Sequence, residues 1–131
     1  MENTTVAGMI SEARQRIDNL SPEQVQSEAG AEDVVLVDIR EPEELAATGG
    51  IPGAIAAPRG MLEFYADAST PYHRPEFDTD KRVILYCASG GRSALAASAL
   101  KQLGFERVAH LDGGIKAWQA AGLPVTTNDG D

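Results

Sequence analysis

The residue of this chain best suited to chemistry is its one cysteine, Cys87. The apolar run Val83–Tyr86 precedes it, and a small glycine-containing segment follows it: Ala88, Ser89, Gly90, Gly91, Arg92 and Ser93. A β-branched run, a short loop and an alanine- and leucine-rich stretch predict a strand, a tight turn and a helix. Amides of the turn and of the first helical turn lack helical partners, and the helix dipole adds positive charge there. We therefore expect these amides to stabilise a Cys87 thiolate, the nucleophilic form of cysteine.

A free cysteine is more commonly a buried residue that packs as a small hydrophobe. That role does not call for two glycines and an arginine directly after the cysteine, so the pattern favours a reactive Cys87. Four residues separate Cys87 from Arg92, which gives the pattern C-x4-R followed by Ser93.

This C-x4-R loop resembles the active-site loop of the rhodanese (sulfurtransferase) superfamily. Cysteine-dependent phosphatases, including dual-specificity ones that share the rhodanese fold, use C-x5-R, because a tetrahedral phosphate needs a wider ring of amides. A shorter ring fits one extra sulfur atom carried on the cysteine, which is the persulfide that rhodaneses form. The loop length therefore favours sulfur transfer over phosphate transfer.

Two further segments resemble the same family, in the expected order. The first is an apolar strand that leads into D-x-R at Asp38 and Arg40 and then into an acidic helix start. Where the family usually has G-H-I-P-G-A, this chain has a glycine, Gly50, in place of the histidine. The second is Leu111–Trp118, which resembles the closing motif of the family.

The resemblance implies an α/β fold: a single rhodanese-like domain with a mainly parallel sheet flanked by helices, preceded here by an N-terminal helix. It implies that Cys87 attacks the outer sulfur of a donor such as thiosulfate and holds it as a persulfide until cyanide or a thiol accepts it. Neither a metal nor an organic cofactor is implied.

The resemblance also assigns roles to the residues around Cys87. Arg92 is a catalytic residue that fixes the loop or meets the anionic donor, and Arg59 binds the donor from a neighbouring turn. Asp38 and Arg40 orient the loop without touching the substrate. The expected substrate-binding residues of the loop itself are Ala88, Ser89, Gly90, Gly91 and Ser93. Ser93 has a second interpretation, as a cap of the following helix.

Three other functions remain open from the sequence. The first is a sulfur-relay module that passes sulfur to a protein acceptor. The second is a cysteine phosphatase or arsenate reductase, which the four-residue spacing disfavours. The third is a binding domain without catalysis, which retention of the cysteine, glycines and arginine disfavours.

The composition and charge of the chain disfavour several classes of binding partner. The chain of 131 residues has a formal charge of −9, which disfavours nucleic acid and anionic membrane surfaces as partners. It has no apolar run of about 18 residues and no basic start before a hydrophobic stretch, so we expect a cytoplasmic protein. One cysteine and two histidines disfavour a disulfide framework or a zinc site, and a thiol that resolves a persulfide must come from another molecule.

The organisation along the chain predicts a helical extension over 1–20, the rhodanese-like domain over 21–125 and a frayed tail over 126–131. Helical spacing of apolar residues predicts an amphipathic helix from Val6 to Ile17, and Ser21–Gln24 carries a capping box. Strands are expected at 34–39, 54–57, 83–86 and 107–111, and helices at 92–103 and 115–121. Ligands bind at the carboxyl ends of the strands in such sheets. The segment 58–79 either frames the pocket or is an ordinary surface insertion.

Overall fold

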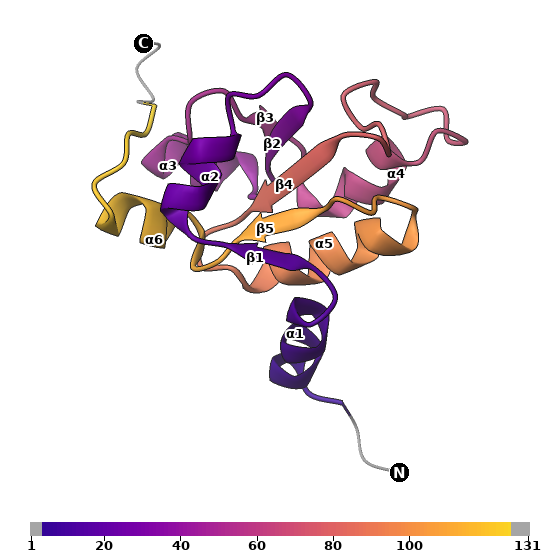
Figure 1. Ribbon diagram of the computed structural model, residues 1–131, viewed down its shortest axis with the longest axis horizontal. Coiled ribbons are helices and arrows are strands. Elements are labelled where there is room, and N and C mark those ends of the chain that lie inside the picture. Colours follow the sequence, from indigo (N-terminus) through magenta and orange to yellow (C-terminus); the bar gives the residue numbers. More distant parts are fainter. Residues whose placement is uncertain (1–3, 127–131) are drawn as a thin grey trace.

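A five-stranded sheet, parallel at every pairing, forms the centre of the computed structural model, which describes residues 4–126. Its spatial order is β1-β5-β4-β2-β3 (Figure 1). The strands are β1 (Asp18–Leu20), β2 (Val34–Asp38), β3 (Ile55–Ala56), β4 (Arg82–Tyr86) and β5 (Ala109–Leu111). The predicted single α/β domain with a mainly parallel sheet is confirmed.

Helices cover both faces of this sheet (Figure 1). They are α1 (Val6–Arg14), α2 (Pro22–Glu28), α3 (Pro42–Thr48), α4 (Leu62–Ala66), α5 (Gly91–Gln102) and α6 (Gly114–Ala120), with a 3-10 turn, η1 (Arg59–Met61), before α4. The residues that α1, α4 and α5 bury form one apolar cluster with the sheet, and those of α2 and α6 form a second.

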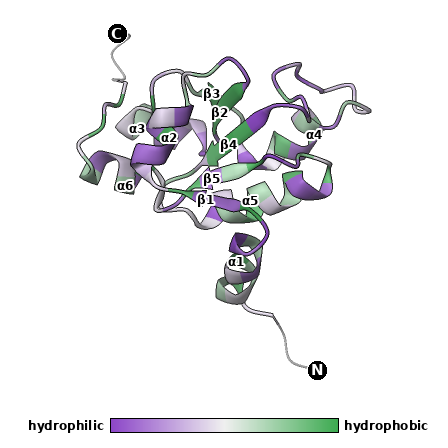
Figure 2. Ribbon diagram, viewed as in Figure 1, coloured by the Kyte–Doolittle hydropathy of each residue, from purple (hydrophilic) through white to green (hydrophobic). Residues whose placement is uncertain are grey.

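The central strand β4 separates these two clusters. Val83 and Leu85 point into the first cluster, whereas Ile84 and Tyr86 point into the second, as the two-residue period of a strand requires. Because both faces are buried, the strand is apolar almost throughout, which Figure 2 shows as green ribbon in the centre of the sheet. The same alternation turns Cys87 toward the first cluster.

The N-terminal segment differs from its prediction. The helix ends at Arg14, short of Ile17, and is followed by β1, an edge strand that the sequence did not predict. Two of its three residues are polar and exposed, so no apolar pattern marks it, and only pairing with the buried β5 makes it a strand. At the other end Thr126 hydrogen-bonds Gly50 through its backbone N–H at 2.7 Å. The rest of the predicted tail, 127–131, lies outside the described residues.

The segment 58–79 holds η1, α4 and a loop stabilised by turns. Phe64 and Tyr72 are exposed and meet edge to face. No helix in residues 4–126 is long and apolar enough to cross a membrane, and no cluster of metal-ligating side chains occurs among them.

Candidate active site

Cys87 directly follows the central strand β4, at its carboxyl end, and lies in the loop that leads to α5. Its side chain is buried, with the whole residue 1 % exposed. The backbone N–H of Gly90 donates a hydrogen bond to Sγ at 3.1 Å. An N–H donor and the amino end of a twelve-residue helix therefore both favour negative charge on this sulfur.

Two glycines let the loop and the start of α6 come into contact. Gly90 has φ +104°, and a Cβ there would lie 3.1 Å from the backbone nitrogen of Gly113. Gly114 has φ +66°, and its Cβ would lie 2.4 Å from the carbonyl carbon of Ala88. Backbone packed against backbone therefore explains Gly114 of the closing motif, whereas a Cβ on Gly113, at φ +83°, would lie 2.6 Å from the Ala117 Cβ.

The first turn of α6 uses that contact to bind the loop. Ile115 donates its N–H to the carbonyl of Cys87 at 2.9 Å, and Lys116 donates to the carbonyl of Ala88 at 3.1 Å. Both carbonyls are therefore turned toward α6. The same loop presents the N–H of Gly90 to the sulfur, so α6 fixes the orientation of the amides around Cys87.

Behind the sulfur lies a buried polar chain that the sequence did not predict. The Ser93 hydroxyl lies 3.6 Å from Cys87 Sγ and 2.9 Å from Nδ1 of His110, and both residues are fully buried. His110 Nε2 in turn lies 2.8 Å from the Asn19 side-chain oxygen, because the β1–β5 register pairs these two residues. Burial lowers the pKa of His110 to about 4.

The Arg92 side chain forms an ion pair with a carboxylate of α3. Its two terminal nitrogens donate to the two oxygens of Glu44, each at 2.8 Å. This bidentate pair, with the N–H of Glu41 as a further donor, lowers the pKa of Glu44 to about 2. The pair joins the start of α5 to α3, and Glu44 is a site residue that the sequence analysis did not single out.

Asp38 and Arg40 form a fully buried ion pair at 2.8 Å. The guanidinium also donates to the Thr48 hydroxyl at 2.8 Å and to the Gly49 carbonyl at 2.6 Å. These contacts attach the end of α3 to β2. The pair reaches the loop indirectly, because α3 carries the carboxylate that binds Arg92.

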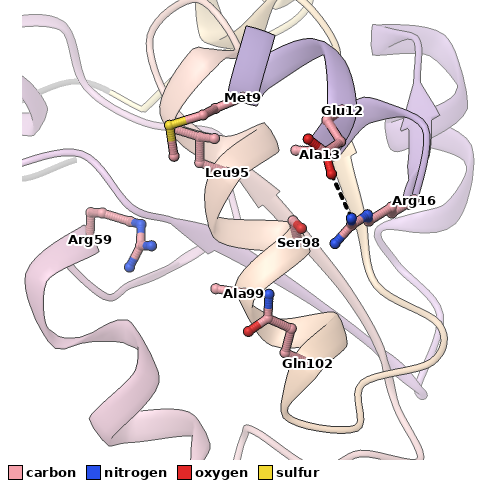
Figure 3. Close-up of a pocket in the computed structure, with 9 residues that line it drawn as sticks. All are labelled: Met9, Glu12, Ala13, Arg16, Arg59, Leu95, Ser98, Ala99 and Gln102. Atoms are coloured by element: carbon pink, nitrogen blue, oxygen red, sulfur yellow. Dashed lines mark hydrogen bonds and ion pairs between the residues drawn. The ribbon is translucent and has the colours of Figure 1, made fainter. Parts of the chain in front are cut away.

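Among residues 4–126, no hydrogen bond or ion pair joins the Arg59 side chain to the Cys87 loop. Arg59 forms an ion pair with Glu63 at 2.6 Å and lines a hollow of about 300 Å³ between α1 and α5 (Figure 3). The other residues around that hollow are Met9, Glu12, Ala13, Arg16, Leu95, Ser98, Ala99 and Gln102. The described structure therefore brings Cys87, Gly90 and Ser93 together and leaves Arg59 outside this group. Ser89 is exposed at the tip of the loop.

These features define an α/β domain with a buried cysteine in a tight loop between a strand and a helix, where the Gly90 amide donates to the sulfur. The chain belongs to the rhodanese-like domain family, whose model matches residues 21–121. It is 42% identical, over 78% of its length and 87% of the relative's, to a sulfurtransferase of Allochromatium vinosum. It is 40% identical to the thiosulfate sulfurtransferase GlpE of Pseudoalteromonas translucida, over 69% of this chain and 77% of that one.

A solved structure is also similar along nearly the whole chain. It is a Rhodopseudomonas palustris protein of unknown function, described as a possible tyrosine phosphatase. The two chains are 43% identical with a TM-score of 0.88, and the match covers 96% of this chain and 99% of the other. The kinship with named sulfurtransferases supports sulfur transfer as the general activity.

Proposed function

We propose that this protein moves a sulfane sulfur from thiosulfate or a persulfide donor to cyanide or a thiol, and that Cys87 carries the sulfur in between. The observation that supports this most directly is the Gly90 N–H directed at Sγ at 3.1 Å, at the start of α5. A thiolate and a persulfide are both anions, and donors already fixed in place stabilise each of them without reorganisation.

The proposed reaction has two steps. The Cys87 thiolate attacks the outer sulfur of thiosulfate, and the S–S bond breaks so that its electron pair leaves with sulfite. Cyanide or a thiolate then attacks the outer sulfur of the persulfide, and Cys87 departs as a thiolate again. The chemistry needs a small sulfur donor and an acceptor, and it needs no metal or organic cofactor.

We assign roles to the neighbouring residues on the same basis. The amides of the loop from Ala88 to Gly91 receive the outer sulfur, and α6 keeps them in place through the two carbonyls that it binds. Arg92 and Glu44 fix the start of α5, while Asp38 and Arg40 fix α3. Arg59 adds positive charge that attracts a dianionic donor.

Phosphate transfer is a second candidate, because the similar Rhodopseudomonas palustris protein is described as a possible tyrosine phosphatase. In this chain the C-x4-R loop is one residue shorter than that of the cysteine phosphatases. The loop length favours sulfur transfer.

The deciding experiment compares two reactions of the same preparation: turnover of thiosulfate with cyanide, and hydrolysis of p-nitrophenyl phosphate. We expect turnover of thiosulfate and no phosphatase activity. Cys87→Ala and Cys87→Ser should abolish sulfur transfer and keep the thermal unfolding transition of a folded protein. Substantial sulfur transfer by either variant would refute the proposal. Repeating the assay with protein thiols as acceptors tests whether the natural acceptor is a protein.

A further inference from the structure

Four polar residues form a continuous chain that begins at the candidate nucleophile and ends at the edge of the sheet. Cys87 Sγ lies 3.6 Å from the Ser93 hydroxyl, which lies 2.9 Å from His110 Nδ1; His110 Nε2 lies 2.8 Å from the Asn19 oxygen. A fully buried imidazole beside the reactive sulfur is not needed to fill the core, since an apolar side chain would do so without the cost of burying polar atoms.

The other contacts of Asn19 determine the direction of each hydrogen bond. Its amide nitrogen donates to the carbonyls of Arg14 and Ile17, at 2.8 and 3.3 Å. The amide oxygen therefore faces His110 and accepts the proton of Nε2. In a neutral imidazole the other nitrogen, Nδ1, then carries a lone pair and accepts the Ser93 hydroxyl proton.

The Ser93 hydroxyl has only one proton and two acceptors within reach, His110 Nδ1 at 2.9 Å and the Gly90 carbonyl oxygen at 3.3 Å. The shorter contact, to a nitrogen that has a lone pair and no other donor, directs this proton at His110. The Ser93 oxygen consequently presents a lone pair to Cys87, so the thiol form of Cys87 is the donor across the 3.6 Å contact. A thiolate in the same place would face that lone pair. Ionisation of Cys87 must therefore change the position of at least one proton in the chain.

We propose that Ser93 and His110 form a proton relay for Cys87, with Asn19 as the residue that holds the imidazole in its receptive tautomer. The S–H bond of Cys87 breaks and its proton passes to the Ser93 oxygen, while the original hydroxyl proton passes to His110 Nδ1. The products are a thiolate that accepts a hydrogen bond from Ser93 and an imidazolium that donates one to Ser93. When the acceptor has taken the sulfur, the same protons move back.

The surroundings of His110 determine its charge while Cys87 is a thiol. Burial lowers the pKa of His110 to about 4, so the imidazole is neutral while Cys87 is a thiol. The charged groups that face it are Asp112, which raises this pKa, and Arg14, which lowers it; the two are paired with each other at 2.9 Å. The new charge that favours an imidazolium is the thiolate itself, and together they make a pair of zero net charge.

The relay rests on the proposed role of Cys87 as the reacting group, but its test needs no sulfur transfer. The side-chain nitrogen signals of His110, followed by NMR against pH in the parent protein, report the protonation of the imidazole. We expect the neutral Nε2–H tautomer while Cys87 is a thiol, and an imidazolium over the pH range in which Cys87 begins to react with iodoacetamide. Alkylation of Cys87 at that pH should return the imidazole to neutral. An imidazole that stays neutral as Cys87 ionises would overturn the relay.

Variants supply a second readout. His110→Gln keeps a hydrogen-bonding amide that cannot take up a proton, and Ser93→Ala removes the bridge. Either change should slow alkylation of Cys87 about tenfold below its pH midpoint, the effect of losing one nearby opposite charge, and the double variant should be no slower. His73→Gln, at the other histidine of the chain, is the matched control and should leave the pH profile unchanged.

Unchanged pH profiles in both folded variants would contradict the relay. If one variant does not fold, the other variant and the NMR titration of the parent still decide the question. Should thiosulfate fail to load Cys87 while His110 follows the ionisation of Cys87, the proposed function fails and the relay stands. If thiosulfate loads Cys87 while the imidazole never changes charge, the relay fails and the proposed function stands.

Discussion

Replacing Gly114 with alanine should test how the Cys87 loop is held, because α6 meets the loop at this residue. The new Cβ would lie 2.4 Å from the carbonyl carbon and oxygen of Ala88 and 2.6 Å from the carbonyl oxygen of Cys87. These are backbone atoms, so the loop and α6 must separate. For a residue with a side chain, the left-handed conformation at φ +66° destabilises the folded state by about 1–2 kcal/mol. Inserting a methyl group into packed structure destabilises it by a further ~1–3 kcal/mol. We therefore expect Gly114→Ala to lower the free energy of unfolding by about 2–5 kcal/mol.

The matched control is Gly122→Ala. Gly122 has φ +78°, but no described atom lies within 4 Å of the position of its Cβ. Gly122→Ala should therefore lower the free energy of unfolding by only about 1–2 kcal/mol, the effect of the left-handed conformation without any steric overlap. Urea denaturation measures the loss of unfolding free energy in each variant. The rate of thiosulfate:cyanide turnover reports whether the Cys87 loop has been displaced. Equal losses of stability, together with parental turnover in Gly114→Ala, would show that α6 does not hold the loop through this contact.

Three further predictions concern charge and loop size. Glu44→Gln should lower the free energy of unfolding by about 1 kcal/mol or less at pH 7, because the Glu44–Arg92 pair is partly exposed. The folded state depresses the pKa of Glu44 to about 2, so the parent loses this advantage over the variant as the pH falls from about 4.5 toward 2. Acid-denaturation curves of the two proteins measure this convergence. Arg59→Ala should raise the KM for thiosulfate more than it lowers kcat, and an unchanged KM would leave Arg59 a structural role only. Inserting a glycine between Gly90 and Gly91 should reduce thiosulfate turnover, and it should let phosphate raise the melting temperature. Undiminished turnover would show that loop length does not select the chemistry.

The strand, loop and helix around Cys87 could be predicted because each depends on neighbouring residues. The apolar run before Cys87 and the glycines after it define the local conformation, and the structure has Gly90 in the left-handed region with its N–H on the sulfur. The family motifs likewise predicted the parallel sheet.

Partners that are distant in sequence could not be predicted. Glu44 lies in an acidic first helical turn, which by itself suggests only favourable interaction with the helix dipole; its pairing with Arg92 depends on where α3 lies. His110 is a single histidine in an apolar strand. Its contact with Asn19 depends on β1, a three-residue edge strand that only the neighbouring β5 specifies.

The proposal that Cys87 carries a sulfur atom is tested most directly by intact-mass analysis after incubation with thiosulfate. We predict that the parent protein gains the mass of one sulfur, that peptide mapping places it on Cys87, and that cyanide removes it. Cys87→Ser, treated in the same way, should gain none. A parent protein that gains no sulfur from thiosulfate or from a persulfide donor, or an equal gain by Cys87→Ser, would contradict the proposal.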